Sequence, residues 1–447
     1  MKKIIWFLFF ACCLQTISFS QGNFVIQNKR ESDKIRFKLI NNLIIIPVEI
    51  NGIELSFILD TGVNKTIIFN FLNISDSLQI KNTETIFLRG LGEGEAIKAL
   101  KSTQNISKIG DAINIDQELY AVLNSNLNFA PRLGFPLHGI IGYDLFKDFV
   151  VEVNYVSKYI RLTNPNVYKA KPCRSCETLN MEFYKNKPYI YLDVKIAEKQ
   201  IPVKLLIDSG GSDALWLFED DSLGIKTSNV FFEDFLGHGL TGSVYGKRSK
   251  IEEVSIRHFK LNKVNVSFPD SESLIYVKQH KDRNGSIAGD LLKRFNLIID
   301  YSSKTISFKK NKHFQDDFSY NKSGIELEQN AVRLVKQKDY NYIAKADFSK
   351  DDNNVSKTPI VLNASYKLAL QPAYSIVELR EGSPAEKAGL MLGDVLVSIN
   401  NKSTDRYSLQ EISHMFYDKH GQRIKLEVER EGVALTFVLY LEDVFEK

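Results

Sequence analysis

The chain of 447 residues is too long for one ordinary domain, and a hydrophobic content of 44% is enough to build several cores. Its 58 lysines and arginines nearly balance its 54 aspartates and glutamates, so the formal net charge is only +4. This balance gives no electrostatic reason to propose a nucleic acid or a membrane surface as a partner.

The start of the chain has the pattern of a secretory signal peptide, which we place at residues 1–20. A basic start is followed by a short apolar run, and the small residues of Ser18-Phe19-Ser20 stand before Gln21 as a cleavage position. A retained anchor is the alternative. The pattern predicts an exported protein that is periplasmic, secreted or held at the cell surface, with no integral membrane segment in its mature form.

A first β-rich lobe is predicted over residues 35–165. Asn51-Gly52 is a two-residue hairpin signal between two apolar strands. The second of these strands runs through Phe57-Ile58-Leu59 directly into Asp60. A glycine-dense loop follows with Gly90 and Gly92, and then a strand that enters a short helix near Gly142. Closing hairpin strands at 150–155 and 159–162 complete the lobe.

Cys173 and Cys176 remain after the signal segment and lie between this lobe and the next. One Cys-x-x-Cys supplies only half of the ligands of a structural zinc site, so we expect no metal there. In an oxidising compartment the pair can form a local disulfide, and free surface thiols are the alternative. No phosphate loop or dinucleotide fingerprint occurs in the proper context, so no cofactor is expected.

The same order of elements recurs over residues 189–310, which predict a second lobe. Leu205-Leu206-Ile207 leads into Asp208, a loop with Gly237 and Gly239 follows, and a strand again enters a helix near Gly289. From the acid to the first loop glycine the distance is 30 residues in one copy and 29 in the other, and to the late glycine it is 82 and 81. Landmarks that stay in register over this length indicate an internal duplication.

Residues 311–360 are rich in polar runs with a few strand-like pieces between them, and are interpreted as a partly ordered connector. Beyond them, residues 361–445 predict a compact α+β domain with strands near 374–379, 394–399, 424–428 and 435–441. A short helix is expected at 383–390 and an amphipathic helix at 409–417, whose Leu409, Ile412 and Phe416 have the spacing of core residues rather than of a ligand groove.

The doubled turn carries the chemistry. Asp60-Thr61-Gly62 alone is weak evidence because surface turns favour these residues, but Asp208-Ser209-Gly210 repeats it after another buried strand. Two carboxylates that meet cannot both ionise cheaply and share a proton. The ionised member can then activate a water while the protonated member donates to a substrate carbonyl. Hydroxyls of Thr61 and Ser209 can fix the pair, and Gly62 and Gly210 let the backbones approach.

This pattern resembles the aspartic peptidase fold, and in its sparse lobes the bacterial retropepsin-like proteases that carry a C-terminal PDZ domain. The resemblance implies a mainly β protein with two lobes about a pseudo-twofold axis and a catalytic role for Asp60 and Asp208. It also suggests that the loops Leu88–Ala96 and Leu236–Tyr245 are flaps, with plain hairpins as the alternative. Pepsin-like enzymes usually place a hydroxyl residue after each motif glycine, where this chain has Val63 and Gly211.

Asp144 and Asp290 also repeat between the lobes, and they are interpreted as residues at helix N-termini, where the helix dipole favours an acid. The segment Glu381-Gly382-Ser383-Pro384-Ala385 and the Gly393-Asp394 turn resemble a bacterial PDZ domain. Such domains bind a C-terminal or extended peptide by strand addition, and Lys367–Ser375 is one candidate for the loop that holds its carboxylate.

The sequence therefore predicts a secreted aspartic endopeptidase that acts on polypeptides without metal or cofactor, with a PDZ domain for peptide docking or regulation. The alternative is a catalytically inactive peptide-binding protein of the same fold. Activity that depends on both Asp60 and Asp208 would separate the two.

Overall fold

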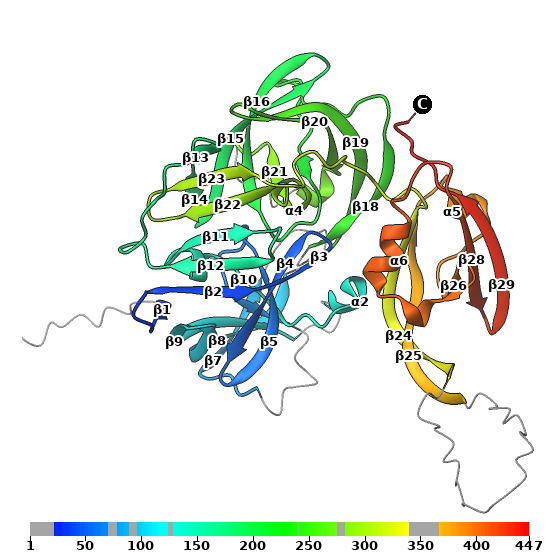
Figure 1. The fold of residues 1–447 in the computed structure, drawn as a ribbon, viewed down its shortest axis with the longest axis horizontal. Helices are drawn as coiled ribbons and strands as arrows, with labels where there is room; N and C mark the ends of the chain where they lie inside the picture. The colour runs from blue at the N-terminus through cyan, green and yellow to red at the C-terminus, as the bar shows by residue number, and fades with distance from the viewer. Residues whose placement is uncertain are drawn as a thin grey trace, which may run out of the picture.

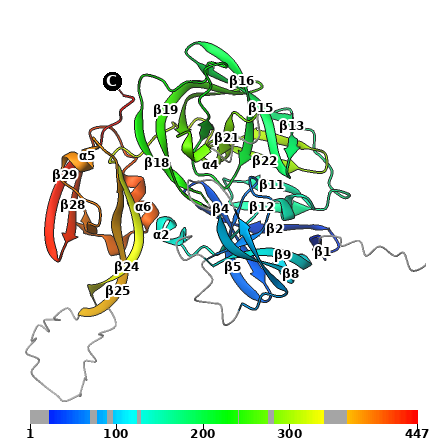
Figure 2. The same ribbon diagram turned by 180° about the vertical axis from the view of Figure 1, so that it is seen from behind.

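The computed structural model describes residues 22–69, 78–88, 96–123, 128–239, 241–274, 282–338 and 366–446. The expected signal peptide, together with Gly90 and Gly92, lies outside these residues. Within the described residues the chain is mainly β, with a few short helices, and forms four sheets. Figures 1 and 2 show the N-terminal and middle parts packed together and a separate C-terminal domain beside them.

The first sheet forms what we call the first lobe. Its strands run in the order β1-β9-β6-β10-β5-β4-β8-β7, with β3 added beside β4. Their bounds are β1 Val25–Ile26, β3 Lys38–Ile40, β4 Leu43–Ile50, β5 Ile53–Leu59, β6 Ile67–Ile68, β7 Thr83–Leu88, β8 Ile97–Ile109, β9 Ala112–Val122 and β10 Gly139–Ile141, and the short helices α2 Ala130–Leu133 and α3 Tyr143–Phe146 belong to the same part of the chain.

A second sheet with the same plan forms what we call the second lobe. Its order is β14-β15-β16-β21-β17-β20-β19-β18. The bounds are β14 Glu182–Tyr184, β15 Lys187–Ile196, β16 Lys199–Asp208, β17 Leu215–Leu217, β18 Phe232–Gly239, β19 Gly242–Ile256, β20 Phe259–Pro269 and β21 Gly285–Ala288, together with the 3-10 turn η2 Glu272–Leu274 and the helix α4 Gly289–Leu292.

The two lobes share one path of strand pairing. In each, the strand that leads to the motif acid pairs in parallel with the strand before the short helix: Leu59 is opposite Ile141, and Asp208 is opposite Ala288. A short strand, β6 or β17, pairs antiparallel with that second strand and parallel with the next one. The repeat of spacings seen in the sequence thus corresponds to a repeat of topology.

A sheet built from both lobes joins them, in the order β13-β23-β22-β11-β12-β2. The closing hairpin predicted at 150–155 and 159–162 is confirmed as β11–β12, its counterpart in the second lobe is β22–β23, and the two hairpins pair where β11 lies antiparallel to β22. Side chains from both lobes pack into one continuous core. The bounds are β2 Ser32–Arg36, β11 Val150–Asn154, β12 Tyr159–Thr163, β13 Cys176–Asn180, β22 Phe295–Asp300 and β23 Thr305–Lys310.

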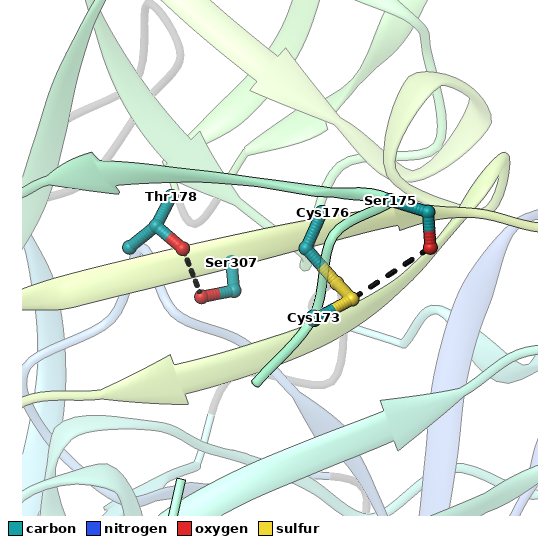
Figure 3. Close-up of a disulfide and its surroundings, with 5 residues drawn as sticks. All are labelled: Cys173, Ser175, Cys176, Thr178 and Ser307. Carbon is teal, nitrogen blue, oxygen red and sulfur yellow. Dashed lines mark hydrogen bonds between the residues drawn. A yellow bond between two sulfur atoms is a disulfide. The ribbon is translucent and has the colours of Figure 1, made fainter. Parts of the chain in front are cut away.

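At one edge of this joining sheet the two cysteines form a disulfide. Cys173 is bonded to Cys176, with the Cα atoms 5.4 Å apart, directly at the start of β13. Figure 3 shows the bond beside the hydrogen bond between Thr178 and Ser307, whose hydroxyl oxygens lie 2.7 Å apart across β13 and β23. Of the two alternatives, the structure has the local disulfide.

The C-terminal domain has its own core and its own sheet, in the order β24-β25-β26-β28-β29. The bounds are β24 Ile325–Lys338, β25 Tyr366–Leu379, β26 Val395–Ile399, β27 Lys402–Ser403 beside β26, β28 Arg423–Arg430 and β29 Val433–Tyr440, with the helices α5 Pro384–Lys387 and α6 Leu409–Met415 and the 3-10 turn η3 Thr404–Arg406. The strands and helices predicted between residues 374 and 441 are confirmed.

Two expectations for this region were wrong. Residues 325–338, predicted to lie in a connector, form β24, because Ile325 and Leu327 are buried in the C-terminal core and anchor the strand there. The segment Lys367–Ser375, proposed as a carboxylate-binding loop, lies inside β25 and pairs with β24 along its length. Its backbone is committed to that ladder and does not form a loop.

Candidate functional site

The site begins where two equivalent strands end. Asp60 follows β5, and its N–H donates to the carbonyl oxygen of Ile141 at 2.8 Å, while Asp208 is the last residue of β16. The apolar residues before each acid are buried, so each strand carries its carboxylate to the end of a well-packed ladder. The two acids predicted from the doubled turn are therefore held by equivalent backbone.

Thr61 and Ser209 tie the two turns together by reciprocal hydrogen bonds. The N–H of Thr61 donates to Ser209 Oγ at 3.0 Å, and the N–H of Ser209 donates to Thr61 Oγ1 at 3.1 Å. Each hydroxyl then donates onward across the pair, Thr61 to the carbonyl of Ile207 and Ser209 to the carbonyl of Leu59, both at 2.7 Å. Because both side chains are buried, these bonds are shielded from water and fix one turn against the other.

The carboxylates meet around the motif glycines. A Cβ on Gly62 would lie 3.1 Å from Asp60 Oδ1 and 3.2 Å from Asp208 Oδ1, so both carboxylates contact the same glycine. On the other side, a Cβ on Gly210 would lie 2.3 Å from the carboxyl carbon of Asp60, which leaves no room for a side chain. The N–H of Gly62 donates to Asp60 at 2.6 Å, and that of Gly210 donates to Asp208 at 3.2 Å. All six residues predicted for this site are thus brought together.

The electrostatics of the pair are unequal. Burial, and next the nearby Asp208 carboxylate, raise the pKa of Asp60 to about 7, although the N–H of Gly62 and the cation of Lys187 act in the opposite direction. Both acids keep part of their surface exposed to solvent. At neutral pH and below, Asp60 therefore tends to hold a proton beside a second carboxyl group, which is the combination that general acid–base catalysis with water requires.

Sequence reasoning missed three residues around the pair. The half-buried Lys187 begins β15 and is close enough to attract both acids, while burial and the nearby Arg283 lower its pKa. Arg283 donates to the carbonyl of Gly285 and to Ser286 Oγ, and burial lowers its pKa as well. The hydroxyl of Tyr301 is buried without a hydrogen-bond partner among the described residues. No motif marks these residues, because their approach depends on strand register.

Two hairpin turns also reach across from one lobe to the other. Asn42, in the turn before β4, donates through its side chain to the carbonyl of Ser212 at 2.8 Å, and Asn64 of the first lobe donates to the carbonyl of Lys185 at 3.3 Å. Each lobe therefore braces the segment that follows the acid of the other lobe.

The repeated acids beyond the site have the structural place predicted for them. Asp144 and Asp290 lie in the first turns of α3 and α4. Asp144 accepts a hydrogen bond from Thr66 at 2.6 Å, and Asp290 forms an ion pair with Lys293 at 2.6 Å. These contacts account for both carboxylates as helix-start residues.

Of the flap candidates, Gly237 and Gly239 are described. Both lie in β18, which pairs with β19 as a hairpin whose register shifts between Phe235 and Gly237. Gly237 has a φ of +151°, which favours glycine, so its presence follows from the irregular strand. A flap function for this hairpin, and for the loop with Gly90 and Gly92, remains a prediction.

Comparison with known proteins concerns the C-terminal domain. Residues 375–430 match the family model of the PDZ domain. Among curated proteins, the chain is similar to the carboxy-terminal processing protease CtpA of Bacillus subtilis, with 40% identity over 59 residues, and to the protease RseP of Yersinia pestis, with 38% identity over 64 residues. These matches cover 13% and 14% of this chain and the same shares of the two relatives, so the chain spans only a small part of their length.

The PDZ domain agrees with the sequence analysis in its details. Ser383 caps α5 by accepting a hydrogen bond from the N–H of Glu386, with Pro384 in the first turn. Leu409, Ile412 and Phe416 are buried in the domain core, as their spacing predicted.

The described residues include no group of three or more His, Cys, Asp or Glu side chains that could hold a metal ion. Likewise, no helix among them is both long and apolar enough to cross a membrane.

Proposed function

We propose that the protein is an exported aspartic-type endopeptidase in which Asp60 and Asp208 activate a water molecule, and that its PDZ domain binds peptides or regulates access to the site. The observation that carries the proposal is the reciprocal hydrogen-bond pair between Thr61 and Ser209, which places both carboxylates against Gly62. Two unrelated surface turns would not need these buried hydroxyls. Thr61 bonds to the strand that precedes Asp208, and Ser209 bonds to the strand that precedes Asp60.

The different surroundings of Asp60 and Asp208 indicate which one acts as the acid and which one as the base. Asp60, with a pKa raised to about 7, holds the proton and donates it to the oxygen of the scissile carbonyl. Asp208 accepts a proton from the water as the water oxygen forms its bond to the carbonyl carbon. Transfer of a proton to the amide nitrogen then allows the C–N bond to break and yields a carboxylic acid and an amine. No metal and no covalent intermediate takes part.

Export is part of the proposal. The predicted signal peptide and the disulfide between Cys173 and Cys176 both fit an oxidising compartment. Polypeptide is the proposed substrate class, in keeping with the protease names of the relatives that resemble the PDZ domain.

The test is a cleavage assay on a broad peptide library between pH 4 and pH 8, with new termini identified by mass spectrometry. We expect cleavage by the native chain and a loss of at least about a thousandfold in Asp60→Asn and in Asp208→Asn. Asp221→Asn is a matched control, because Asp221 is 91% exposed and pairs only with a surface lysine. Substantial cleavage by either dyad variant would contradict the dyad.

The catalytically inactive peptide-binding protein is the second candidate. The observation in its favour is that Val63 and Gly211 provide no hydroxyl next to the acids; the space at Gly211 is limited by Ala288, whose Cβ would lie 3.0 Å from a new Cβ. Folded native protein that cleaves nothing in the library at any pH would select this alternative.

A further inference from the structure

The helix α2 of the first lobe lies against the open edge of the PDZ sheet. In that sheet β24 is an edge strand that pairs with β25 on one side only, and α6 lies alongside it. Figures 1 and 2 both show α2 next to β24 and α6. The side-chain amide of Gln410 donates to the carbonyl of Leu133, and a Cβ on Gly134 would lie 2.7 Å from the Cβ of Leu409. The first lobe therefore sits where β24 and the start of α6 meet.

One arginine makes the central contact. Arg132 donates from Nη2 to Glu378 of β25 at 3.1 Å. Its Nε lies 2.7 Å from Glu328 of β24, at an angle that does not suit a hydrogen bond, so this second contact is electrostatic. The guanidinium also stacks over the ring of Phe235 in β18, 4.3 Å from the ring centroid. We call these four residues the Arg132 junction, and through it the two lobes and the PDZ domain meet at one side chain.

The junction is well shielded. The side chains of Arg132, Glu328 and Glu378 are 19%, 22% and 24% exposed. Charge pairs in such partly buried positions are held more firmly than surface pairs, and removing one partner leaves the other charges uncompensated. Nearby, burial and then the charge of Arg132 lower the pKa of His238 to about 4, so the imidazole adds no competing positive charge at neutral pH.

The contact of α2 with β24 uses side chains, as a bound peptide would, but it lacks the backbone hydrogen bonds that a bound peptide forms. PDZ domains bind an extended peptide by adding it to a strand edge beside a helix. Among the described residues no backbone hydrogen bond joins α2 to β24, so α2 covers this edge with side chains and leaves its ladder groups unused. An extended peptide can make the same side-chain contacts and add backbone bonds, which gives it the means to displace α2.

We propose that residues 128–137 of the first lobe are an internal ligand of the PDZ edge formed by β24 and α6, and that an external extended peptide carrying an arginine competes with them for Glu328 and Glu378. Glu328 and Glu378 together recognise the guanidinium of either ligand, and Gln410 at the start of α6 donates to the backbone carbonyl that follows the arginine. Residues 128–137 and an external peptide cannot occupy Glu328 and Glu378 at the same time.

Displacement has a consequence for the second lobe. When an external arginine takes over Glu328 and Glu378, Arg132 loses its anchors and its stacking on Phe235 no longer ties the β18–β19 hairpin to the PDZ domain. If the proposed function holds and this hairpin is a flap, peptide binding at the PDZ edge changes access to the catalytic pair. This last step rests on the proposed function, whereas the competition itself does not.

The test uses the full chain and a fluorescein-labelled peptide with the sequence of residues 128–137, Asn-Phe-Ala-Pro-Arg-Leu-Gly-Phe-Pro-Leu. An internal ligand that occupies the PDZ edge most of the time weakens external binding in proportion. We therefore expect Arg132→Ala to bind the probe about tenfold or more tightly than the native chain, by fluorescence anisotropy. Arg161→Ala is the matched control: it removes an arginine that pairs with Glu152 at 3.3 Å within the first lobe, and it should bind like the native chain.

Two further arms establish the recognition. A probe with its arginine changed to glutamine should lose at least tenfold in affinity for Arg132→Ala, and Glu328→Gln with Glu378→Gln in the Arg132→Ala background should lose a similar factor for the original probe. Equal affinity of native chain and Arg132→Ala, or no binding of the probe by a folded Arg132→Ala, would overturn the proposal.

Hydrogen exchange provides a readout that does not depend on the variants. Saturating probe should raise exchange in 130–133 and 232–239 of the native chain and lower it along β24. Unchanged exchange in 130–133 with probe bound would place the peptide elsewhere and refute competition. Because none of these measurements uses catalysis, their failure is distinguishable from failure of the proposed function.

Discussion

The two motif turns have the same backbone arrangement, but the residues on the neighbouring strand opposite Asp60 and Asp208 differ. Extending the β4–β5 ladder by two residues beyond the pair of Ile45 and Ile58 places Leu43 opposite Asp60. Extending the β15–β16 ladder by two residues beyond Tyr189 and Leu206 places Lys187 opposite Asp208. Cross-strand neighbours stand about 5 Å apart, so the position opposite Asp60 is aliphatic and the position opposite Asp208 is a lysine, whose charge acts on both acids.

This difference shows how a duplicated framework can hold an asymmetric site. The reciprocal bonds of Thr61 and Ser209 need equal geometry from both copies. A shared proton needs unequal surroundings, so that one carboxyl keeps it. Burial of Asp60, and next the charge of Asp208, raise the pKa of Asp60, while Lys187 acts on both acids and takes no part in the hydrogen bonds that hold the turns together.

The largest effect is expected from adding a methyl group at two neighbouring glycines of the second turn. In Gly210→Ala the new Cβ would lie 2.3 Å from the carboxyl group of Asp60 and must displace it, so we expect peptide cleavage to fall by at least about a hundredfold. In Gly211→Ala the new Cβ would lie 3.0 Å from the Cβ of Ala288 and at an ordinary contact distance of 3.7 Å from the carboxyl carbon of Asp208, so this variant should keep most of its activity. Steady-state cleavage rates of the two variants test this, and equal losses would show that the carboxylate position is not what limits the rate.

Removing the hydroxyl of Thr61 or Ser209 should destabilise the folded chain, because these hydroxyls hold the two turns together. Thr61→Val leaves the N–H of Ser209 and the carbonyl of Ile207 buried without partners, at a cost of about 2–5 kcal/mol in the free energy of unfolding. Ser209→Ala removes the equivalent bonds to Thr61 and Leu59 and should cost a similar amount. Urea unfolding measures both. A loss below about 0.5 kcal/mol in either would mean that water replaces the missing hydroxyl.

The raised pKa of Asp60 predicts a stability that falls as pH rises. The folded state keeps the proton of Asp60 up to about pH 7, whereas the unfolded chain loses it near 3.8. Stability is therefore lost between these pH values, by up to about 4 kcal/mol and less where solvent reaches the pair. Asp60→Asn should unfold at a higher temperature than the native chain at pH 8 and show little gain at pH 3. A native chain whose melting temperature does not fall relative to Asp60→Asn over this range would contradict the raised pKa.

The smallest expected effect concerns Lys187, the cation near both acids. Lys187 lowers the pKa of Asp60, so Lys187→Met should move both limbs of the pH–activity profile upward by about half a unit to one unit. Lys199→Met, at the far end of the same β15–β16 ladder, is the control and should leave the profile in place. A profile that does not move in Lys187→Met would show that the charge of this residue does not act on the acids.

Much of the framework could be predicted from the sequence because it is encoded locally. Apolar runs before Asp60 and Asp208, the Asn51-Gly52 turn and the glycines at constant spacing each act within a few residues, and the strands, hairpins and short helices expected from them are present. The connector was misjudged for the opposite reason. Exposed and charged positions dominate β24, and only Ile325 and Leu327 at its start reveal that it belongs to the C-terminal core.

By itself, the sequence determined that two strand-and-turn units recur in register and that a PDZ-like segment follows them. Tertiary structure alone decided that Thr61 and Ser209 bond reciprocally, that Lys187 lies near both acids, and that Arg132 meets Glu328 and Glu378. The physical reason is that these contacts join residues far apart in the chain through strand register and domain packing. The β4–β5 and β15–β16 hairpins differ in length, so Leu43 and Lys187 stand at different distances from their acids along the sequence, and only the folded ladders align them.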